Sequence, residues 1–437
     1  MAKITDFASV TTGTLQVYAN GSTGNDTNDG LTVGTPKLTL GAVFALVPDI
    51  VKHNVCVNLA GTFTDPGIVN FLRDVREGGF LVIDGGDATT TIAGSYTANI
   101  HSVSTIGLTT AGWTADAYVG YTVSITSGAC SGQKRTINAH TETTITPVKD
   151  WTEDPGHATF VIERPTTTIA ASSVTSIIDL DIISRGTGAV PVCSFCLQRL
   201  YVSGTVAEIH LAGVGLTRAT NVISDSSRAW SWRWNPTTLY LLAIRYNPTT
   251  FAEVPSTTEF VGLSIRGNTW TMSSYCYLDG AYIACMGYLK SKLWVRYGTR
   301  IKGLTLYAQA CCVMSSAVGY APIRIKAAPY YGISVTQGSV VETGDYVEIS
   351  YNGAGGIVCD GGQVRITGVV SPLSGTNNIT HGCYVITGSC IVTSGATPTM
   401  VGTVVECAAY SVSATWAQIQ AGTILLDANY QALARKL

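Results

Sequence analysis

The amino-acid sequence predicts an all-β protein whose main part is a parallel β-helix, with an N-terminal capping helix and a small inserted antiparallel β domain. Two observations predict the β-helix. The 437-residue chain contains 46 glycines and only 12% charged residues, and its many Thr, Ser, Val and Ile residues favour strands. A pattern of strand and glycine also recurs at a nearly fixed interval near the carboxyl end. The low charge further suggests that copies of the chain cover part of its surface.

The repeated pattern contains two glycines six residues apart, and its three copies begin 24 and 26 residues apart. The glycine pairs are Gly332 and Gly338, Gly356 and Gly362, and Gly382 and Gly388. Apolar residues occupy matching positions in the three copies: Ile333, Ile357 and Cys383; Val335, Cys359 and Val385; Val340, Val364 and Cys390. Weaker copies surround Gly85, Gly280 and Gly298.

Strand geometry explains this repeat. Alternate residues point to one face of a strand, and a glycine allows the tight conformation that turns a corner. If each circuit returns one strand spacing higher, about 4.8 Å, equivalent residues stack into ladders inside the coil. Gly338, Gly362 and Gly388 are then expected to turn one corner. A two-sheet sandwich also has alternating strands, but it gives no reason for matching positions to recur every 24 to 26 residues.

The open end of such a coil needs a cover, and the segment "TPKLTLGAVFALVPDI" predicts a short helix that supplies one. Thr35 is a suitable N-cap, and Pro36 suits the first helical position. The apolar residues of this helix are Leu38, Ala42, Phe44, Ala45 and Leu46. The segments "VCVNLAGTF" and "FLVIDGG" that follow are expected to form the first strands.

The opening of the chain resembles a known group of proteins. "LQVYANGSTGNDTNDGLTVGTPKLTLGAVFALVP", followed by "VNLAGTF", is similar to the opening of right-handed β-helix proteins of the pectin-lyase-like superfamily, particularly bacteriophage tailspike and tail-fibre proteins. The resemblance covers about the first 65 residues, and its sharpest element is "TGNDTNDGLTVGTP", with Asn25, Asp26, Asp29, Gly30 and Pro36. It implies a right-handed coil, a homotrimer and a place in a phage particle.

The Asp26 and Asp29 pair has two interpretations. Two carboxylates so close together are compatible with calcium. Asn and Asp side chains also cap their own backbone in turns, and this second interpretation is the one we favour.

The pattern of strands and turns in the sequence changes between Gly107 and Arg164. The segments "YTVSIT", "KRTIN", "TTITPV" and "TFVIE" alternate between polar turns, which predicts a small antiparallel β domain inserted into the coil. It also resembles a module found inside phage β-helix proteins. We therefore divide the chain into a cap and first rungs at 1–106, an insert at 107–164, a main coil at 165–409, and a closing strand with a short helical tail at 410–437.

Two groups of side chains are candidates for contact with partners or substrate. Trp230, Trp232 and Trp234 alternate, so they are expected to share one strand face, where they could stack on a glycan or be buried between subunits. Asp179 and Asp181 are expected to face outward together, and repulsion between them could raise one pKa enough for general-acid catalysis. Glu342, Asp345 and Glu348 form a second, looser acidic cluster. Outward acids on such a coil are ordinarily just solvated.

Composition and motifs exclude several function classes. The net charge of −2 provides no basic field for nucleic acid, and no apolar run reaches the roughly 20 residues of a membrane span. "MAKITDFASV" lacks the features of a signal peptide, so we expect synthesis in the host cytoplasm. There is no P-loop, GxSxG or HExxH motif, and the histidines have no metal-ligand or triad spacing. We therefore expect no cofactor and no metal.

The cysteines are expected to be reduced and buried. Twelve are scattered along the chain, several within apolar patterns, as volume-filling residues would be. Cys193 and Cys196 form a CxxC pair, but a zinc site would need further ligands nearby, which the sequence does not offer.

These observations together predict a virion structural protein, a tail fibre, tailspike or similar appendage, that attaches to other virion proteins and presents a surface to a host receptor. The alternative is a depolymerase, a glycoside hydrolase or lyase that cleaves bacterial capsule or lipopolysaccharide, with Asp179 and Asp181 as acid and base. A third alternative is a carbohydrate-binding module without catalysis.

Overall fold

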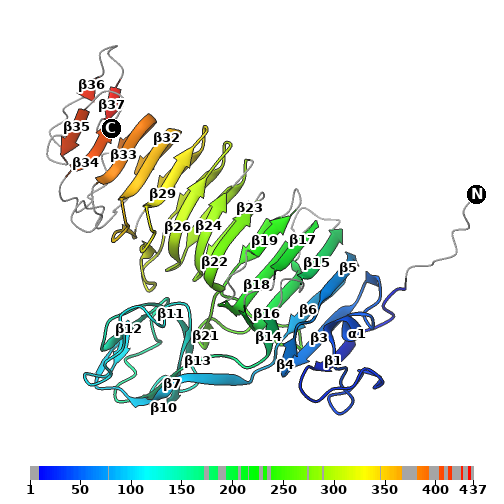
Figure 1. Cartoon of the computed structure of the whole chain (residues 1–437). Helices are drawn as coiled ribbons and strands as arrows, with labels where there is room; N and C mark the ends of the chain where they lie inside the picture. The colour runs from blue at the N-terminus through cyan, green and yellow to red at the C-terminus, as the bar shows by residue number, and fades with distance from the viewer. Residues whose placement is uncertain are drawn as a thin grey trace, which may run out of the picture. The chain divides into compact units, whose positions relative to one another are not determined.

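The structure is a computed structural model. It describes residues 9–76, 78–171, 177–185, 193–204, 208–214, 216–225, 230–233, 238–272, 275–287, 290–344, 346–366, 381–392, 403–407, 412–415, 425–426 and 432–434. The chain divides into two compact units, 1–95 with 161–268 and 96–160 with 269–437. Both contain stacked parallel strands, so the expected parallel β-helix is confirmed (Figure 1). Strands β7 (Thr89–Thr97), β13 (Thr159–Pro165) and β22 (Ser264–Met272) cross the division between the units.

The strands of the first unit pair in parallel and form three stacks. One stack runs through β1, β3, β6, β16 and β18, a second through β4, β14 and β16, and a third through β5, β15, β17 and β19. The strands are β1 (Leu15–Asn20), β2 (Ile50–Val51), β3 (Asn54–Ala60), β4 (Thr62–Thr64), β5 (Ile68–Arg76), β6 (Phe80–Asp84), β14 (Thr168–Ala171), β15 (Ile177–Arg185), β16 (Cys193–Gly204), β17 (Glu208–Val214), β18 (Leu216–Ser224), β19 (Trp230–Arg233), β20 (Thr238–Leu241) and β21 (Glu259–Phe260). The predicted first strands are β3 and β6.

A helix, α1 (Leu40–Phe44), lies at the start of this coil, as expected. Its N-cap is Thr39, whose hydroxyl oxygen accepts from the N–H of Ala42 at 3.2 Å. The predicted cap, Thr35, was wrong. Lys37 bonds to β1 instead, its N–H donating to Tyr18 O at 2.9 Å, and the carbonyl of Thr35 accepts from the N–H of Gly30 at 3.0 Å, so this segment is held in a turn and not in a helix.

Carboxylates hold the turn that leads to α1. Asp26 accepts from the N–H groups of Leu38 at 2.8 Å and Thr39 at 2.9 Å, and Asp29 accepts from the N–H of Leu31 at 3.0 Å. Burial acts to raise the pKa of Asp26, but the hydrogen bonds from Thr39 and Leu38 lower it overall. The two aspartates therefore cap backbone, as the turn interpretation proposes.

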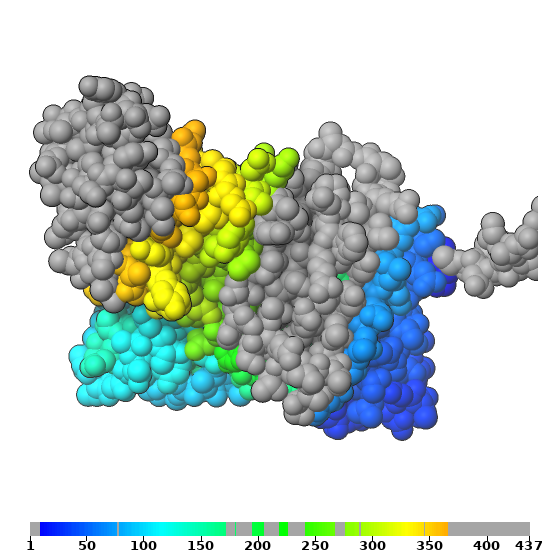
Figure 2. Space-filling model, turned by 45° about the horizontal axis from the view of Figure 1, so that its top comes forward, coloured from blue at the N-terminus to red at the C-terminus, as the bar shows by residue number. Residues whose placement is uncertain are grey.

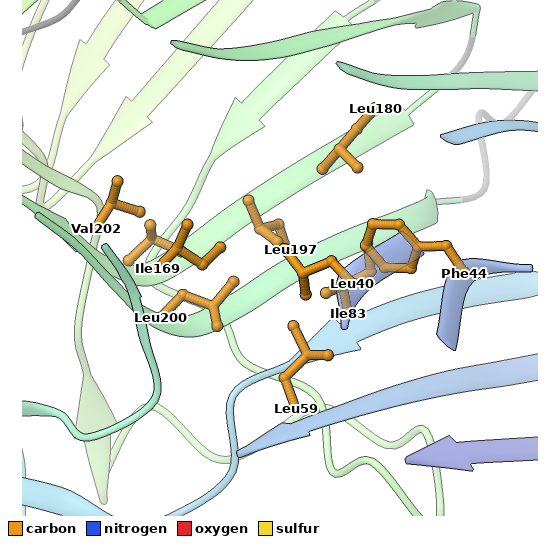
Figure 3. Close-up of a pocket in the computed structure, with 10 residues that line it drawn as sticks. Leu40, Phe44, Leu59, Ile83, Ile169, Leu180, Leu197, Leu200 and Val202 are labelled. Carbon is orange, nitrogen blue, oxygen red and sulfur yellow. The ribbon is translucent and has the colours of Figure 1, made fainter. Parts of the chain in front are cut away.

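The side chains of α1 close the interior of the first unit. Leu40, Val43 and Phe44 are buried, and the ring of Phe44 lies 4.4 Å from that of Phe71 on β5. Leu40 and Phe44 line a cavity of about 10 Å³ together with apolar residues of the coil (Figure 3). All the residues that line it are apolar, and its volume is about that of one water probe, so this cavity is a packing gap and not a ligand site.

The second unit contains its own parallel coil and the insert. Its strands are β8 (Ile100–Ser102), β9 (Thr105–Gly107), β10 (Thr122–Ser127), β11 (Lys134–His140), β12 (Thr144–Pro147), β23 (Tyr275–Asp279), β24 (Tyr282–Gly287), β25 (Lys292–Arg296), β26 (Arg300–Leu306), β27 (Cys311–Met314), β28 (Ile323–Ile325), β29 (Tyr331–Thr336), β30 (Val340–Thr343), β31 (Val347–Ile349), β32 (Gly355–Ile366), β33 (His381–Val392), β34 (Thr403–Cys407), β35 (Val412–Thr415), β36 (Leu425–Leu426) and β37 (Ala432–Ala434).

The register of this coil confirms the first predicted ladders. Ile333 pairs with Ile357, which pairs with Cys383, and Val335, Cys359 and Val385 pair in the same way. The third ladder was misplaced by one residue. Val341, and not Val340, pairs with Val364, and Val341 is the buried member of that strand.

Glycines turn the corner between these stacks. Gly338 has φ +75°, and Gly362 pairs with Gly388. In the rung of Gly362 the positive φ belongs to its neighbour Gly361, at +73°. Gly362 is needed for a different reason, because a Cβ there would lie 2.8 Å from the carbonyl oxygen of Ser339.

The last described residues are all strands. β35 pairs antiparallel with β34, and β36 pairs antiparallel with β37. Residues Ala432–Ala434, for which the sequence predicts a short helical tail, form β37. Helix propensity is weak over so few residues, so pairing with a neighbouring segment decides their conformation.

The insert is an antiparallel β domain, as predicted. Its strands pair antiparallel in the order β10, β11, β12, β9 and β8. It has a core of its own, in which Trp113 lies edge-on to Tyr96 at 5.4 Å between ring centroids and Phe160 is fully buried. The insert, cyan in Figure 2, lies against yellow and green rungs of the same unit.

Polar contacts attach the insert to the coil. Arg300 of β26 donates two hydrogen bonds to Asp116, at 3.0 and 2.8 Å, and one to the carbonyl oxygen of Asn138. Arg324 of β28 donates to the side-chain oxygen of Asn138, whose amide donates to the carbonyl of Gly298. We call these five residues, Asp116, Asn138, Gly298, Arg300 and Arg324, the insert clamp.

Replacing a ladder residue should destabilise the coil. Ile357 is fully buried, so Ile357→Ala leaves a cavity and is expected to lower the free energy of unfolding by about 2–5 kcal/mol. Val358→Ala, next to it on the outward side of β32, should lower it by less than about 1 kcal/mol. Urea denaturation followed by circular dichroism measures both. Equal losses would contradict the inward position of Ile357.

Removing the clamp carboxylate should loosen the insert. In Asp116→Ala the buried Arg300 side chain, 4% exposed, loses its charged partner, and unfolding of the insert should become easier by about 1–3 kcal/mol. Hydrogen exchange at β10 to β12 measures this. The matched control is Asp154→Ala, which removes a half-exposed carboxylate of the insert that bonds His101, and it should change exchange little. If Asp116→Ala exchanges as slowly as the unchanged protein, the insert clamp does not stabilise the insert.

Candidate functional site

The two aspartates predicted to be catalytic lie on β15 of the first unit. Asp179 pairs with Asn70 on one side and His210 on the other, and Asp181 pairs with Leu72 and Ala212. Asn70 and Leu72 are exposed. The described residue between the aspartates, Leu180, is 2% exposed, which agrees with the predicted alternation along the strand. The side chains of Asp179 and Asp181 lie outside the described part of the structure.

The register also places a histidine beside Asp179, which the sequence spacing did not reveal. Asp179, His210 and Ser231 occupy one position on the adjacent strands β15, β17 and β19 (Figure 1). Neighbouring strands are about 4.8 Å apart, so this column places residues of acid–base type side by side. A constant number of residues per rung could have revealed this neighbour in the sequence. The turns between these strands differ in length, so no constant number is visible.

The register gives a different column to the tryptophans. Trp232 pairs with Leu211, which pairs with Leu180, whereas Ser231 and Arg233 continue the columns of Asp179 and Asp181. Trp230 belongs to β19 and Trp234 lies outside the described residues. Contact of these three tryptophans with a glycan or a subunit stays a prediction.

The structure does not bring the second acidic cluster together. Glu342 is on β30 and Glu348 on β31, in different stacks, and Asp345 lies outside the described residues. Glu348 accepts from Arg324 at 3.0 Å and forms an ion pair with Lys326. Burial acts to raise the pKa of Glu348, but Lys326 and Arg324 lower it overall. Glu348 is therefore a paired anion of the coil, not a proton donor.

A different carboxyl group, Asp279, has the perturbed acidity that a functional acid needs. It is 5% exposed at the end of β23, and Arg296 of the next rung donates to its two oxygens at 3.0 and 3.1 Å. Burial raises the pKa of Asp279 to about 6, although Arg296 opposes the shift. This acidity could not be predicted from the sequence, because a lone Asp before a glycine is typical of turns.

One buried charge cluster of the first unit is structural. Arg199 donates to Asp84 at 2.6 Å, and Gln198 donates to the same carboxylate at 3.1 Å. Arg199 and Asp84 are 3% and 1% exposed. This buried, hydrogen-bonded pair lies at a local bend of β16, where Arg199 has φ +58°.

Eight cysteines whose side chains the structure describes are free thiols, and all of these except Cys311 are buried, as expected: Cys56, Cys130, Cys196, Cys276, Cys285, Cys311, Cys312 and Cys359. Burial raises the pKa of Cys56, Cys276, Cys285 and Cys312, which makes these thiols unreactive. Cys196 of the CxxC pair is fully buried. Within the described ranges no group of three or more His, Cys, Asp or Glu side chains is arranged to hold a metal ion.

No helix in the part of the chain that the structure describes is long and apolar enough to cross a membrane.

Comparison with known proteins gives little beyond the fold. No protein-family model and no curated protein matches the sequence. Among solved structures, the tailspike gp61 of Pseudomonas phage phi297 is 8% identical, with 91% of this chain and 76% of that chain covered and a TM-score of 0.25. The tailspike gp49 of Pseudomonas phage LKA1 is 10% identical, with 82% and 67% covered and a TM-score of 0.19.

A third similar structure is the tailspike gp54 of Acinetobacter baumannii bacteriophage AP22, in complex with an A. baumannii capsular saccharide. It is 8% identical, 81% of this chain and 71% of that chain are covered, and the TM-score is 0.18. TM-scores this low carry no inference about function.

Asp279 and Glu348 should affect the pH dependence of stability in opposite directions. Asp279 holds its proton to higher pH when folded, so the free energy of unfolding should fall as the pH rises from about 4 to about 6, by about 1–3 kcal/mol. Asp279→Asn should remove this fall. The lowered pKa of Glu348 means that its contribution is present above pH 4.5 and is lost as the pH falls below its folded pKa.

Urea denaturation between pH 3 and pH 7 measures both effects. Glu348→Gln should therefore lower the free energy of unfolding more at pH 7 than at pH 3. Asp279→Asn should lower it less at pH 7 than at pH 3. If the two variants follow the same pH profile, the opposed acidities assigned here are wrong.

Proposed function

We propose that this chain is a structural protein of a bacteriophage particle, a tail fibre or tailspike-like appendage that attaches the particle to the host surface. One observation carries the proposal. The opening residues that resemble those of phage tailspike and tail-fibre proteins fold into β1, the Asp26 turn and α1, which together close the end of a parallel coil. The segment therefore lies at the entrance of a coil, which is the place that the resemblance implies, and this supports the resemblance beyond sequence similarity.

A stacked coil suits this role for mechanical reasons. Rungs are hydrogen-bonded to one another along three stacks, so bending the coil requires many bonds to be broken together. The proposed homotrimer, with several copies on one particle, would multiply weak contacts with a receptor. The receptor class that the resemblance implies is a surface glycan.

The second candidate function is that of a depolymerase acting on this glycan. The column of Asp179 and His210, with Asp181 two residues along β15, favours it because two carboxylates and an imidazole provide an acid and a base for glycosidic cleavage or elimination. In this proposal Asp179 and Asp181 exchange protons with the substrate, and His210 orients Asp179.

Cell-binding and product-release assays test both candidates. The purified full chain should bind capsulated bacteria from a strain panel and fail to bind their capsule-deficient mutants, and immunogold labelling should locate it on the particles whose genome encodes it. Its mass in solution should be three times the chain mass of 46.0 kDa. Absence from the particles would reject the appendage.

Incubation with purified capsular polysaccharide distinguishes a structural appendage from an enzyme. Oligosaccharides released by the unchanged protein, and lost at least a hundredfold in Asp179→Asn or Asp181→Asn, would establish the depolymerase. Asp225→Asn is a matched control, since Asp225 follows β18 and bonds Arg266 at 2.9 Å. If the protein binds the polysaccharide but releases no oligosaccharides, only the attachment role is supported.

A further inference from the structure

Two histidines of the insert lie side by side although they are far apart in the sequence. His101 is on β8, and His157 lies in the segment that connects β12 to β13. The centroids of their rings are 5.2 Å apart, and the ring planes are inclined by 72°. The His101 side chain is partly exposed and His157 is exposed, so solvent reaches both imidazoles. We call these two residues the histidine pair.

Backbone hydrogen bonds hold the two segments of the histidine pair together. β8 is the last strand in the order of the insert sheet. On one side of β8 the N–H of Trp151 donates to the carbonyl oxygen of Val103 at 2.7 Å. On the other side the N–H of Ala98 donates to the carbonyl oxygen of Ala158 at 3.0 Å. The connecting segment is therefore fixed at both ends against the edge of β8.

Each imidazole is oriented by a hydrogen-bond acceptor of its own. Nδ1 of His101 donates to Oδ1 of Asp154 at 2.8 Å, and Nδ1 of His157 donates to the carbonyl oxygen of Ala98 at 2.9 Å. A carboxylate and a carbonyl can only accept, so Nδ1 carries the proton and the Nε2 atom of each neutral ring presents a lone pair. Among the described residues, neither Nε2 atom has a hydrogen-bond partner.

These features are those of histidines that bind a metal ion. A metal-ligating histidine donates its other ring N–H to a carboxylate or a backbone carbonyl, which fixes the tautomer and the ring orientation. At a metal–nitrogen distance of about 2.0–2.1 Å and a tetrahedral angle, the ring centroids of two histidines that share an ion lie about 5 Å apart. The observed separation of 5.2 Å matches this value.

A surface ion pair alone explains only part of the arrangement. The contact between His101 and the half-exposed Asp154 is of a kind that contributes little to stability. It gives no reason for a second exposed imidazole beside the first, oriented by a separate acceptor. Two protonated imidazoles at this distance would also repel each other, whereas a shared metal ion binds both rings in their neutral form.

We propose that His101 and His157 bind a divalent transition-metal ion, Zn²⁺, Ni²⁺ or Cu²⁺, through their Nε2 atoms. Imidazole nitrogen suits these ions, whereas Ca²⁺ and Mg²⁺ prefer oxygen ligands. Asp154 is a positioning residue that orients the His101 ring. The described ranges contain no group of three or more ligating side chains, so water completes the coordination and the ion exchanges with solution. This site is independent of the proposed function, which stands whether or not the ion binds.

Calorimetric titration of the full, untagged chain with ZnCl₂ tests the proposal, after removal of metal with EDTA and dialysis. The tightest site should bind one ion per chain, and an excess of Mg²⁺ should not compete. His101→Ala and His157→Ala should each weaken binding at least about tenfold, because each removes one of two ligands. Thermal melting in EDTA confirms that each variant is folded.

Asp154 has a test of its own. Asp154→Ala should weaken Zn²⁺ binding by about 10–100-fold, as loss of a group that orients a ligand does. Asp154→Asn keeps an acceptor oxygen for His101, so it should bind Zn²⁺ more tightly than Asp154→Ala. If both variants bind Zn²⁺ as tightly as the unchanged protein, Asp154 has no positioning role.

Electron paramagnetic resonance of the Cu²⁺-loaded chain counts the ligands directly. The unchanged protein should show coupling of the copper electron to two imidazole nitrogens, and His101→Ala or His157→Ala should show coupling to one. A purely structural role of either ring would not change this signal. Two couplings that persist in a single variant would overturn the site.

His53→Ala is the matched control. His53 is an exposed histidine of the first unit, and its Nδ1 lies 3.0 Å from the carbonyl oxygen of Thr11. Its replacement should leave the stoichiometry and the affinity for Zn²⁺ unchanged. A loss in His53→Ala equal to that in His101→Ala, or no binding by the unchanged chain, would reject the proposal.

Hydrogen exchange shows whether one ion joins the two segments. An ion shared by the histidine pair should slow exchange of the Ala98 and Trp151 amides, whose bonds hold these segments together. The slowing should occur on addition of Zn²⁺ to the unchanged protein and be absent in His157→Ala. Unchanged exchange at saturating Zn²⁺ would contradict a shared ion.

Discussion

Parallel pairing in register is the constraint on which the rest of this protein depends. Once Ile333, Ile357 and Cys383 share one column, each rung must repeat the inward pattern of the rung below, and only outward and turn positions are free to vary. The same pairing leaves an unpaired strand at an end of the coil, which is why α1 and the Asp26 turn are needed there. Stability resides in the inward columns, and variation is confined to what faces outward.

The inward columns were predictable from sequence because they follow strand alternation, and the turns were not. Val340 was placed one residue from its true partner because three residues separate it from Thr336, whereas only two separate Gln363 from Asp360 on the next rung. Thr35 was taken as the helix cap because a capping preference is local, whereas its carbonyl is bonded by the N–H of Gly30 and Lys37 is bonded to β1. Local patterns identified the elements, and non-local pairing decided their limits.

The candidate sites show the same division more sharply. Asp179 and Asp181 could be predicted as a pair because they are two residues apart. His210 lies beside Asp179 only because of the number of residues in the intervening rung, and the sequence pattern does not reveal that number. The acidity of Asp279 and Glu348 was equally hidden. Both are acids beside arginine on this coil, yet Asp279 meets one cation and Glu348 meets two. Burial prevails over a single partner and is overcome by a second, so the two pKa values move in opposite directions.

The insert shows how a rigid coil can carry a variable part. Trp113 and Phe160 pack in a core that belongs to the insert itself. The insert clamp is accordingly polar, with Arg300 and Arg324 donating to Asp116 and Asn138. Charge-assisted hydrogen bonds are directional, whereas apolar contact is not, so such a clamp fixes orientation with few residues. The β-bridge between Lys149 of the insert and Tyr320 of the coil is a further contact that fixes this orientation.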